Sequence, residues 1–145
     1  MEELRRLLDE EPGLLEAEDN NPWRRSGPLH LACYWGCMEA ACFLLDRGAA
    51  IDSRDDLGST PLMQACFMGR VGVVRLLFAR GADPALRDDN SWTALMEASC
   101  GVEGVGSDHV AVIRLLLEDG RVEIDARHVE GRTALWLACC NGYTE

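Results

Sequence analysis

One short segment recurs along this chain in a regular register. Thr60 begins TPLMQACFMGR, Thr93 begins TALMEASC and Thr133 begins TALWLACC, at intervals of 33 and 40 residues. Pro28, in the segment GPLHLACYWGC, precedes Pro61 by a further 33 residues. A leucine-rich stretch that ends in glycine follows three of these four openings, at residues 43–48, 76–81 and 115–120. Because a unit of this size cannot bury an apolar face alone, we expect about four copies to stack on one another.

Each unit has the pattern of two short helices joined by a turn. Thr60 can cap a first helix that begins at Pro61, where the missing amide hydrogen of proline is harmless. Apolar residues then share one face as far as Gly69, which favours a reversal of the chain. A second helix is expected from about Val71 to Arg80, ended by Gly81. The segment GADPALRDDNS that follows has no helical periodicity, so it predicts a loop or short hairpin.

This recurring unit resembles the ankyrin repeat. The fullest match to the family's TPLH opening is GPLHLACYWGCMEAACFLLDRGAAIDSRDDLGS, and the cleanest unit overall is STPLMQACFMGRVGVVRLLFARGADPALRDD. The resemblance covers nearly the whole chain. It implies an all-α fold, an ankyrin-repeat solenoid of stacked helix-turn-helix units with short hairpin tips. It also implies a concave groove, lined by the first helices and the tips, that usually binds other proteins.

The repeat register divides a single domain, residues 1–145, into unequal units. These are a degenerate leading half-repeat or cap at 1–24, repeat 1 at 25–57, repeat 2 at 58–90, repeat 3 at 91–130 with an insertion near 101–107, and a truncated repeat 4 at 131–145. The insertion, GVEGVGS, predicts a glycine-rich surface loop. Repeat 4 stops where its second helix should begin, so we expect the natural protein to continue. A stack that ended there would expose Leu135 and Leu137.

The charge of the chain excludes some classes of partner. It has 14 Lys and Arg residues against 25 Asp and Glu residues, a formal net charge of −11. Such a surface repels phosphate backbones and anionic headgroups, so neither nucleic acid nor a membrane is expected as a partner. No apolar run is long enough to span a membrane, and residues 1–13 do not have the pattern of a signal peptide. The expected location is intracellular, in the cytoplasm, with the nucleus as the alternative.

Cysteines suggest a metal site that the repeat alignment argues against. The chain has seven cysteines, with no spacing that resembles a disulfide framework, so reduced thiols are expected. His30, Cys33 and Cys37 have helical spacing, and Cys42 could supply a fourth zinc ligand. However, one repeat position that favours a small residue in the ankyrin family holds a cysteine in three units: Cys33, Cys66 and Cys139. Structural cysteines are therefore preferred, and metal or redox sensing stays a weaker alternative.

Three patterns that could suggest catalysis or phosphate binding are better explained by structure. The run GVEGVGSD follows no predicted strand and contains no Lys or Arg, so it does not predict a phosphate-binding loop. The pairs Asp55-Asp56 and Asp88-Asp89 recur at hairpin tips, where aspartate favours turns, rather than as an acid-base dyad. The three histidines, His30, His109 and His128, suggest no pairing with a nucleophile. The sequence predicts no enzyme activity, no catalytic residue, no cofactor and no metal.

Bulky side chains occupy the positions that face the groove in ankyrin repeats. Tyr34 and Trp35 fill them in repeat 1, and Phe67 and Met68 fill them in repeat 2. Such side chains are enriched at binding hot spots, and an acidic rim would steer a basic partner. The alternative is that the aromatic rings pack between repeats and that Trp92 covers the base of a loop. The predicted partner-binding residues are Trp23, Arg24, Tyr34, Trp35, Asp56, Leu57, Ser59, Phe67, Met68, Asp89, Asn90 and Trp92.

Two functions are compatible with these observations. The preferred one is a non-catalytic interaction module that binds a protein or peptide with basic and apolar groups in the groove. The alternative is a targeting domain of a larger enzyme, such as a ubiquitin ligase component, a kinase or a methyltransferase, with its catalytic part beyond residue 145. The sequence leaves the oligomeric state open.

Overall fold

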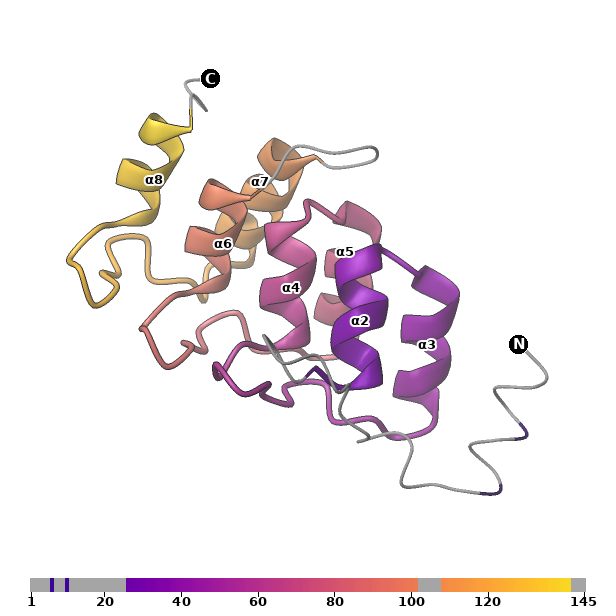
Figure 1. Cartoon of the computed structure of the whole chain (residues 1–145). Coiled ribbons are helices and arrows are strands. Elements are labelled where there is room, and N and C mark those ends of the chain that lie inside the picture. The colour runs from indigo at the N-terminus through magenta and orange to yellow at the C-terminus, as the bar shows by residue number, and fades with distance from the viewer. Residues whose placement is uncertain (1–5, 7–9, 11–25, 102–107, 142–145) are drawn as a thin grey trace.

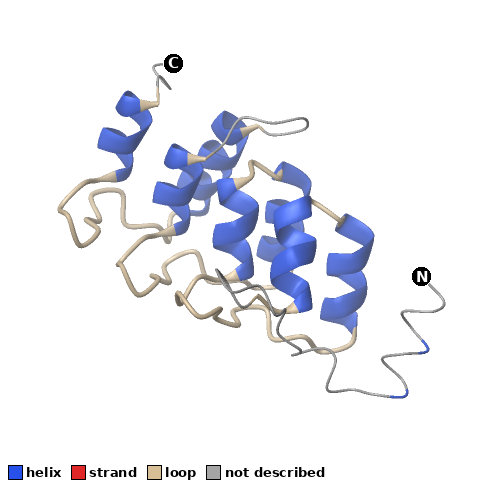
Figure 2. Ribbon diagram, in the orientation of Figure 1, coloured by secondary structure: helices blue, strands red, loops and turns tan. Residues whose placement is uncertain are grey.

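The protein is an array of paired helices. The computed structural model describes residues 6, 10, 26–101 and 108–141 (Figure 1). The helices within these residues are α2 (Pro28–Trp35), α3 (Met38–Asp46), α4 (Pro61–Phe67), α5 (Val71–Ala79), α6 (Ala94–Cys100), α7 (His109–Asp119) and α8 (Ala134–Cys140). Figure 2 shows helices and loops in the described part of the chain, and an isolated β-bridge joins Arg87 to Thr93. The expected all-α fold is confirmed.

The helices form two rows. The first helices of the units, α2, α4, α6 and α8, pack against one another in chain order, and α3, α5 and α7 form a second row (Figure 1). The loops that connect one unit to the next lie together at one edge of the stack. We call these loops the tips. This arrangement gives a solenoid in which every interior helix has a neighbour on either side.

Threonine caps set the beginning of three first helices, as the sequence predicts. The hydroxyl oxygens of Thr60, Thr93 and Thr133 accept hydrogen bonds from the backbone N–H three residues later, at 3.4, 3.3 and 3.3 Å. Each bond satisfies an amide that the helix itself leaves without an acceptor. Helix α2 begins after Gly27, without a side-chain cap, and has Pro28 in its first turn.

The core lies between the two rows and between neighbouring units. In α4 every residue from Pro61 to Cys66 is buried, because α2 and α6 cover it from both sides. In α5, Val74 and Leu77 are completely buried. This helix ends at Ala79, one residue before the predicted end, and Arg80 follows it as the C-cap.

The expectation that Leu135 and Leu137 are both exposed is half wrong. Leu135 is 72% exposed, but Leu137 is only 5% exposed and belongs to the core. The reason lies in the repeat register, in which Leu137 corresponds to Gln64. Gln64 is also buried, and its amide donates to Asp55 in the preceding tip. This position therefore faces backward along the stack, whereas Leu135 faces forward.

Two sequence predictions lie outside the described residues. They are the leading half-repeat or cap at 1–24, of which only Arg6 and Glu10 are described, and most of the insertion, residues 102–107. None of the described helices has the length and apolar character needed to cross a membrane.

Candidate protein-binding surface

Aspartates organise the tips through backbone hydrogen bonds. One carboxylate oxygen of Asp55 accepts from the N–H groups of Leu57 and Ser59, at 3.0 and 2.9 Å. Asp88 accepts in the same way from Asn90 and Trp92, at 2.9 and 2.7 Å. The first aspartate of each Asp-Asp pair therefore holds a turn, as its place at a tip predicts.

A row of arginines connects neighbouring tips. Arg54 donates to the carbonyl oxygen of Arg87 at 2.9 Å and to the carboxylate of Asp89 at 3.0 Å. Arg87 in turn donates to the carbonyl oxygen of Arg127 at 3.5 Å and pairs with Glu123. We call Arg54, Arg87 and Arg127 the arginine ladder. Because each step links equivalent positions in successive units, the ladder fixes the spacing of the tips.

The last member of the ladder bonds within its own tip. Arg127 donates to the carbonyl oxygen of Gly131 at 2.8 Å. The ladder also leaves no room for a side chain at position 58. A Cβ at Gly58 would overlap the guanidinium of Arg54 and the carboxylate of Asp89. Gly58 has φ +74°, which independently favours glycine.

An exposed tryptophan, Trp35, lies beside a small hollow at the end of α2 that is remote from the tips. The side chain of Trp35 is 64% exposed and meets the ring of Tyr34 edge to face, with centroids 5.1 Å apart. An open hollow of about 220 Å³ lies beside it, and we call this the Trp35 hollow. Its lining residues are Trp35, Gly36, Met38, Arg70, Val71, Gly72 and Val73.

The Trp35 hollow spans the helix–helix turns of two successive units. Met38 forms part of its wall and is 40% exposed. Gly72 leaves room for Met38, because a Cβ there would lie 2.8 Å from the Met38 methyl group. Arg70 donates through Nε to the Tyr34 carbonyl at 3.2 Å, which joins the two turns.

His109 repeats that connection one unit further along. Its Nε2 donates to the Phe67 carbonyl at 2.9 Å, just as Arg70 donates to Tyr34. Both donors stand at the same repeat position, and both acceptors stand at the first groove position of the preceding unit. The groove positions are therefore held in place by the unit that follows them.

The structure separates the predicted partner-binding residues by exposure. Tyr34, Phe67 and Met68 are half-buried, whereas Asp56, Leu57 and Trp35 are exposed. At the next tip Asp89 and Asn90 are exposed, and Asp89 is paired with Arg54. Trp23 and Arg24 lie outside the described residues.

Two predicted residues have structural contacts that compete with a binding role. Ser59 is completely buried, because its N–H bonds to Asp55 and its carbonyl accepts from His30 at 3.0 Å. Its side chain is therefore not part of the surface, and the prediction that it contacts a partner is corrected. Trp92 is half-buried and stacks on His128, with centroids 5.3 Å apart. That stacking corresponds to the alternative in which Trp92 covers the base of a loop.

The cysteines considered as zinc ligands, and Cys66 at the repeat position of Cys33, lie in different environments. Cys33 and Cys66 are buried, and burial raises the pKa of the Cys33 thiol to about 12 and that of Cys66 well above its ordinary value. Cys37 is exposed, and Cys42 accepts from Arg80 at 3.3 Å on the second row. Among the residues that the structure describes, no three His, Cys, Asp or Glu side chains gather as a metal site would require.

Sequence reasoning missed two features of this surface. Met38 and Arg70 line the Trp35 hollow, although neither was a candidate. The arginine ladder was also missed, but it left a signal. Arg54, Arg87 and Arg127 recur at the same intervals of 33 and 40 residues as the capping threonines.

Successive helix pairs, repeated caps and linked tips define a helical repeat solenoid. A family model described as ankyrin repeats (3 copies) matches residues 2–88 and again residues 78–145. The chain therefore belongs to the ankyrin repeat family, as its TPLH-like openings predict. A comparison with curated proteins gave no match. Ankyrin repeats are generally protein–protein interaction modules.

Proposed function

We propose that this chain is a non-catalytic interaction module whose binding surface is formed by the tips and first helices of repeats 1 and 2 together with the Trp35 hollow. The observation that carries the proposal is the 64% exposure of Trp35. An indole ring is costly to leave in water, and tryptophan is the residue type most enriched at binding hot spots. Trp35 remains exposed although α4 and α5 of the following unit are in place.

The Trp35 hollow supplies the apolar part of the surface. A partner side chain of leucine or methionine size can enter between Trp35 and Met38, with the backbone of Gly72 beside it. Tyr34 supports the indole edge-on, so the ring is held without closing the hollow. Anchors of this kind gain affinity because the receiving side chains are already ordered.

Charged groups at the tips supply the polar part. Asp56 and Asp89 are exposed at the start of the first helices, whereas Trp35 lies at the end of α2. The eight residues of α2 alone span about 12 Å, and the two aspartates lie in the tips that precede α4 and α6. The proposed partner is therefore a protein or peptide with an apolar anchor and, towards the tip end of the first helices, one or more Lys or Arg side chains. A further cation could stack on the open face of Trp35.

The test is capture from a cell lysate followed by measurement with the purified partner. We expect Trp35→Ala and Phe67→Ala each to weaken binding by about 1–4 kcal/mol, because truncated hot-spot residues lose affinity on this scale. The matched control is Trp136→Ala, which removes a 46%-exposed tryptophan from α8, outside the proposed surface. A partner that binds wild type and control alike but is lost by the double variant supports the proposal. Equal binding by the double variant contradicts it.

Salt provides a second readout for the acidic tips. If Asp56 and Asp89 steer a basic partner, added salt should slow association more than it speeds dissociation. An association rate that does not respond to salt would remove the electrostatic part of the proposal and leave the apolar anchor.

A further inference from the structure

The wall of the Trp35 hollow includes a methionine side chain that solvent reaches. Met38 is 40% exposed. Of the other methionines that the structure describes, Met68 is half-buried, and Met63 and Met96 are only 1% and 0% exposed. A peroxide oxidises a thioether only where it reaches the sulfur atom, so burial protects Met63 and Met96. Met38 is therefore the described methionine that a peroxide reaches most readily in the folded chain.

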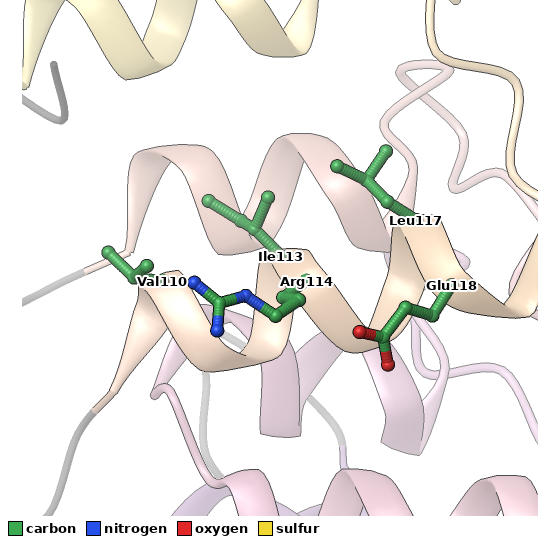
Figure 3. Close-up of a pocket in the computed structure, with 5 residues that line it drawn as sticks. All are labelled: Val110, Ile113, Arg114, Leu117 and Glu118. Atoms are coloured by element: carbon green, nitrogen blue, oxygen red, sulfur yellow. The ribbon is translucent and has the colours of Figure 1, made fainter. Parts of the chain in front are cut away.

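The repeat register places an apolar residue at the position of Met38 in three units. Met38 begins α3, Val71 begins α5 and Val110 is the second residue of α7. Met38 and Val71 line the Trp35 hollow, and Val110 lines a separate hollow on α7 (Figure 3). Because a valine side chain has no sulfur to oxidise, Met38 alone of these three residues brings an oxidisable atom to this position.

The Met38 side chain reaches the unit that follows it. A Cβ added to Gly72 would lie 2.8 Å from the Met38 methyl carbon, so this methyl carbon lies against the backbone of α5. The sulfur is bonded to that methyl carbon, and Met38, Gly72 and Trp35 line the same hollow. An oxygen atom added to the sulfur would therefore stand at the wall of the Trp35 hollow, next to the space proposed for the apolar anchor.

We propose that Met38 is an oxidation site whose sulfoxide lowers the affinity of the Trp35 hollow for an apolar anchor, an inference that rests on the function proposed above. A lone pair of the sulfur attacks one oxygen of hydrogen peroxide, the O–O bond breaks, an S–O bond forms and water leaves. The sulfur loses two electrons and the peroxide gains them. A methionine sulfoxide reductase reverses the step, because its thiols supply two electrons, a disulfide forms and the oxygen leaves as water.

Oxidation changes the polarity of one wall of the hollow. The methionine thioether is flexible and apolar, which suits a surface that receives an apolar side chain. The sulfoxide is polar, and an apolar anchor that covered its oxygen would remove water from an acceptor without replacing the hydrogen bond. The partner should therefore dissociate faster from the oxidised protein. The acidic tips are remote from Met38, so they keep their role in association.

Peptide mapping after limited peroxide treatment tests the first step without a partner. The chain has no lysine, so trypsin cleaves after arginine, and residues 26–47 form a peptide in which Met38 is the only methionine. In the folded chain we expect Met38 to be oxidised at least about tenfold faster than Met63 and Met96. In urea the three rates should converge, because unfolding exposes the buried side chains. Equal rates in the folded chain would overturn the proposal.

Affinity for the purified partner tests the second step. The oxidised protein is first treated with dithiothreitol, which reverses sulfenic acids and disulfides of the cysteines and leaves the sulfoxide in place. Affinity should then be about tenfold lower than before oxidation and should return after treatment with methionine sulfoxide reductases for both epimers. Selective oxidation of Met38 without a change in affinity would refute the proposal and leave the function of the surface intact. Affinity that responds neither to oxidation nor to Trp35→Ala would contradict the proposed function itself.

Substitutions assign the effect to one side chain. Met38→Leu keeps an apolar group of similar volume, so it should bind within about threefold of wild type and no longer respond to peroxide. The matched controls are Met68→Leu, which removes the half-buried methionine, and Cys37→Ser, which removes the exposed thiol next to Met38 in the chain. Both controls should stay sensitive to peroxide, and far-ultraviolet circular dichroism establishes that all three variants keep their helices. A folded Met38→Leu variant that still loses affinity on oxidation would overturn the assignment to Met38.

Discussion

The burial of one leucine in each unit depends on the unit that follows it, and this dependence can be measured. Leu62, Leu95 and Leu135 occupy the same position of the first helix. They are 0%, 4% and 72% exposed, respectively. The side chain and its local helix are equivalent in all three, so the difference reports the presence of a neighbouring unit. The perturbation is the substitution of each leucine by alanine.

The structure sets the expected magnitudes. Leu62→Ala should cost about 2–5 kcal/mol of the free energy of unfolding, because it leaves a cavity between α4 and its neighbours. Leu95→Ala should fall in the same range of about 2–5 kcal/mol. Leu135 has only about a quarter of its surface buried, so Leu135→Ala should cost about 0.5 kcal/mol. We therefore expect the loss of unfolding free energy to be large at Leu62 and Leu95 and to drop sharply at Leu135, rather than to decline gradually along the chain.

Urea unfolding followed by circular dichroism measures these free energies, with the denaturant slope compared among variants. Low protein concentration keeps any association from contributing to the result. A cost for Leu135→Ala as large as that for Leu62→Ala would mean that something covers Leu135 in solution. A cost for Leu62→Ala of less than about 1 kcal/mol would refute the reasoning that neighbouring units bury this position.

Three further predictions concern the tips and the buried thiol. Arg54→Ala should destabilise the protein by about 0.5–1.5 kcal/mol in urea unfolding, and Arg54→Lys should recover less than half, because lysine lacks the planar fork that reaches both Arg87 and Asp89. Ser91→Gly should raise the free energy of unfolding by about 0.5–1 kcal/mol, measured by thermal melting, because Ser91 has φ +62° where the other tips have glycine. The pKa of Cys33 is about 12 in the folded state against 9.0 ordinarily, so the unfolded state loses this proton first and stability falls as pH rises from 9 towards 12. The stability advantage of wild type over Cys33→Ala should therefore shrink by about 1.4 kcal/mol between about pH 8 and about pH 10, and a constant difference would contradict this account.

The helix pairs could be predicted because their signals are local. Thr60 and Pro61 start a helix by contacts within one turn, and Gly81 ends the second helix in the next few residues. The interval between repeats then places the units in order without knowledge of any long-range contact. For the same reason the all-α solenoid followed from sequence alone.

The surface was harder to predict because its geometry depends on contacts between units. Ser59 was predicted as a tip residue at the surface, but it is buried, and its backbone N–H and carbonyl bond to Asp55 and His30. The arginine ladder has acceptors that are backbone carbonyls of the next unit, and a sequence does not show where these point. Leu137 was misjudged because its apolar character alone gives no direction along the stack.

Position in the stack separates the exposed apolar residues into two kinds. Leu135 is exposed because no described helix follows α8, so its exposure reflects the repeat register and carries no information about a partner in the groove. Trp35 is different, since the next unit is present and packs against α2, yet the indole is still 64% exposed. Packing by the following unit therefore leaves Trp35 exposed. Trp35 is a large apolar side chain that stays exposed beside a packed neighbouring unit. This exposure is the strongest reason to look for the partner at the Trp35 hollow.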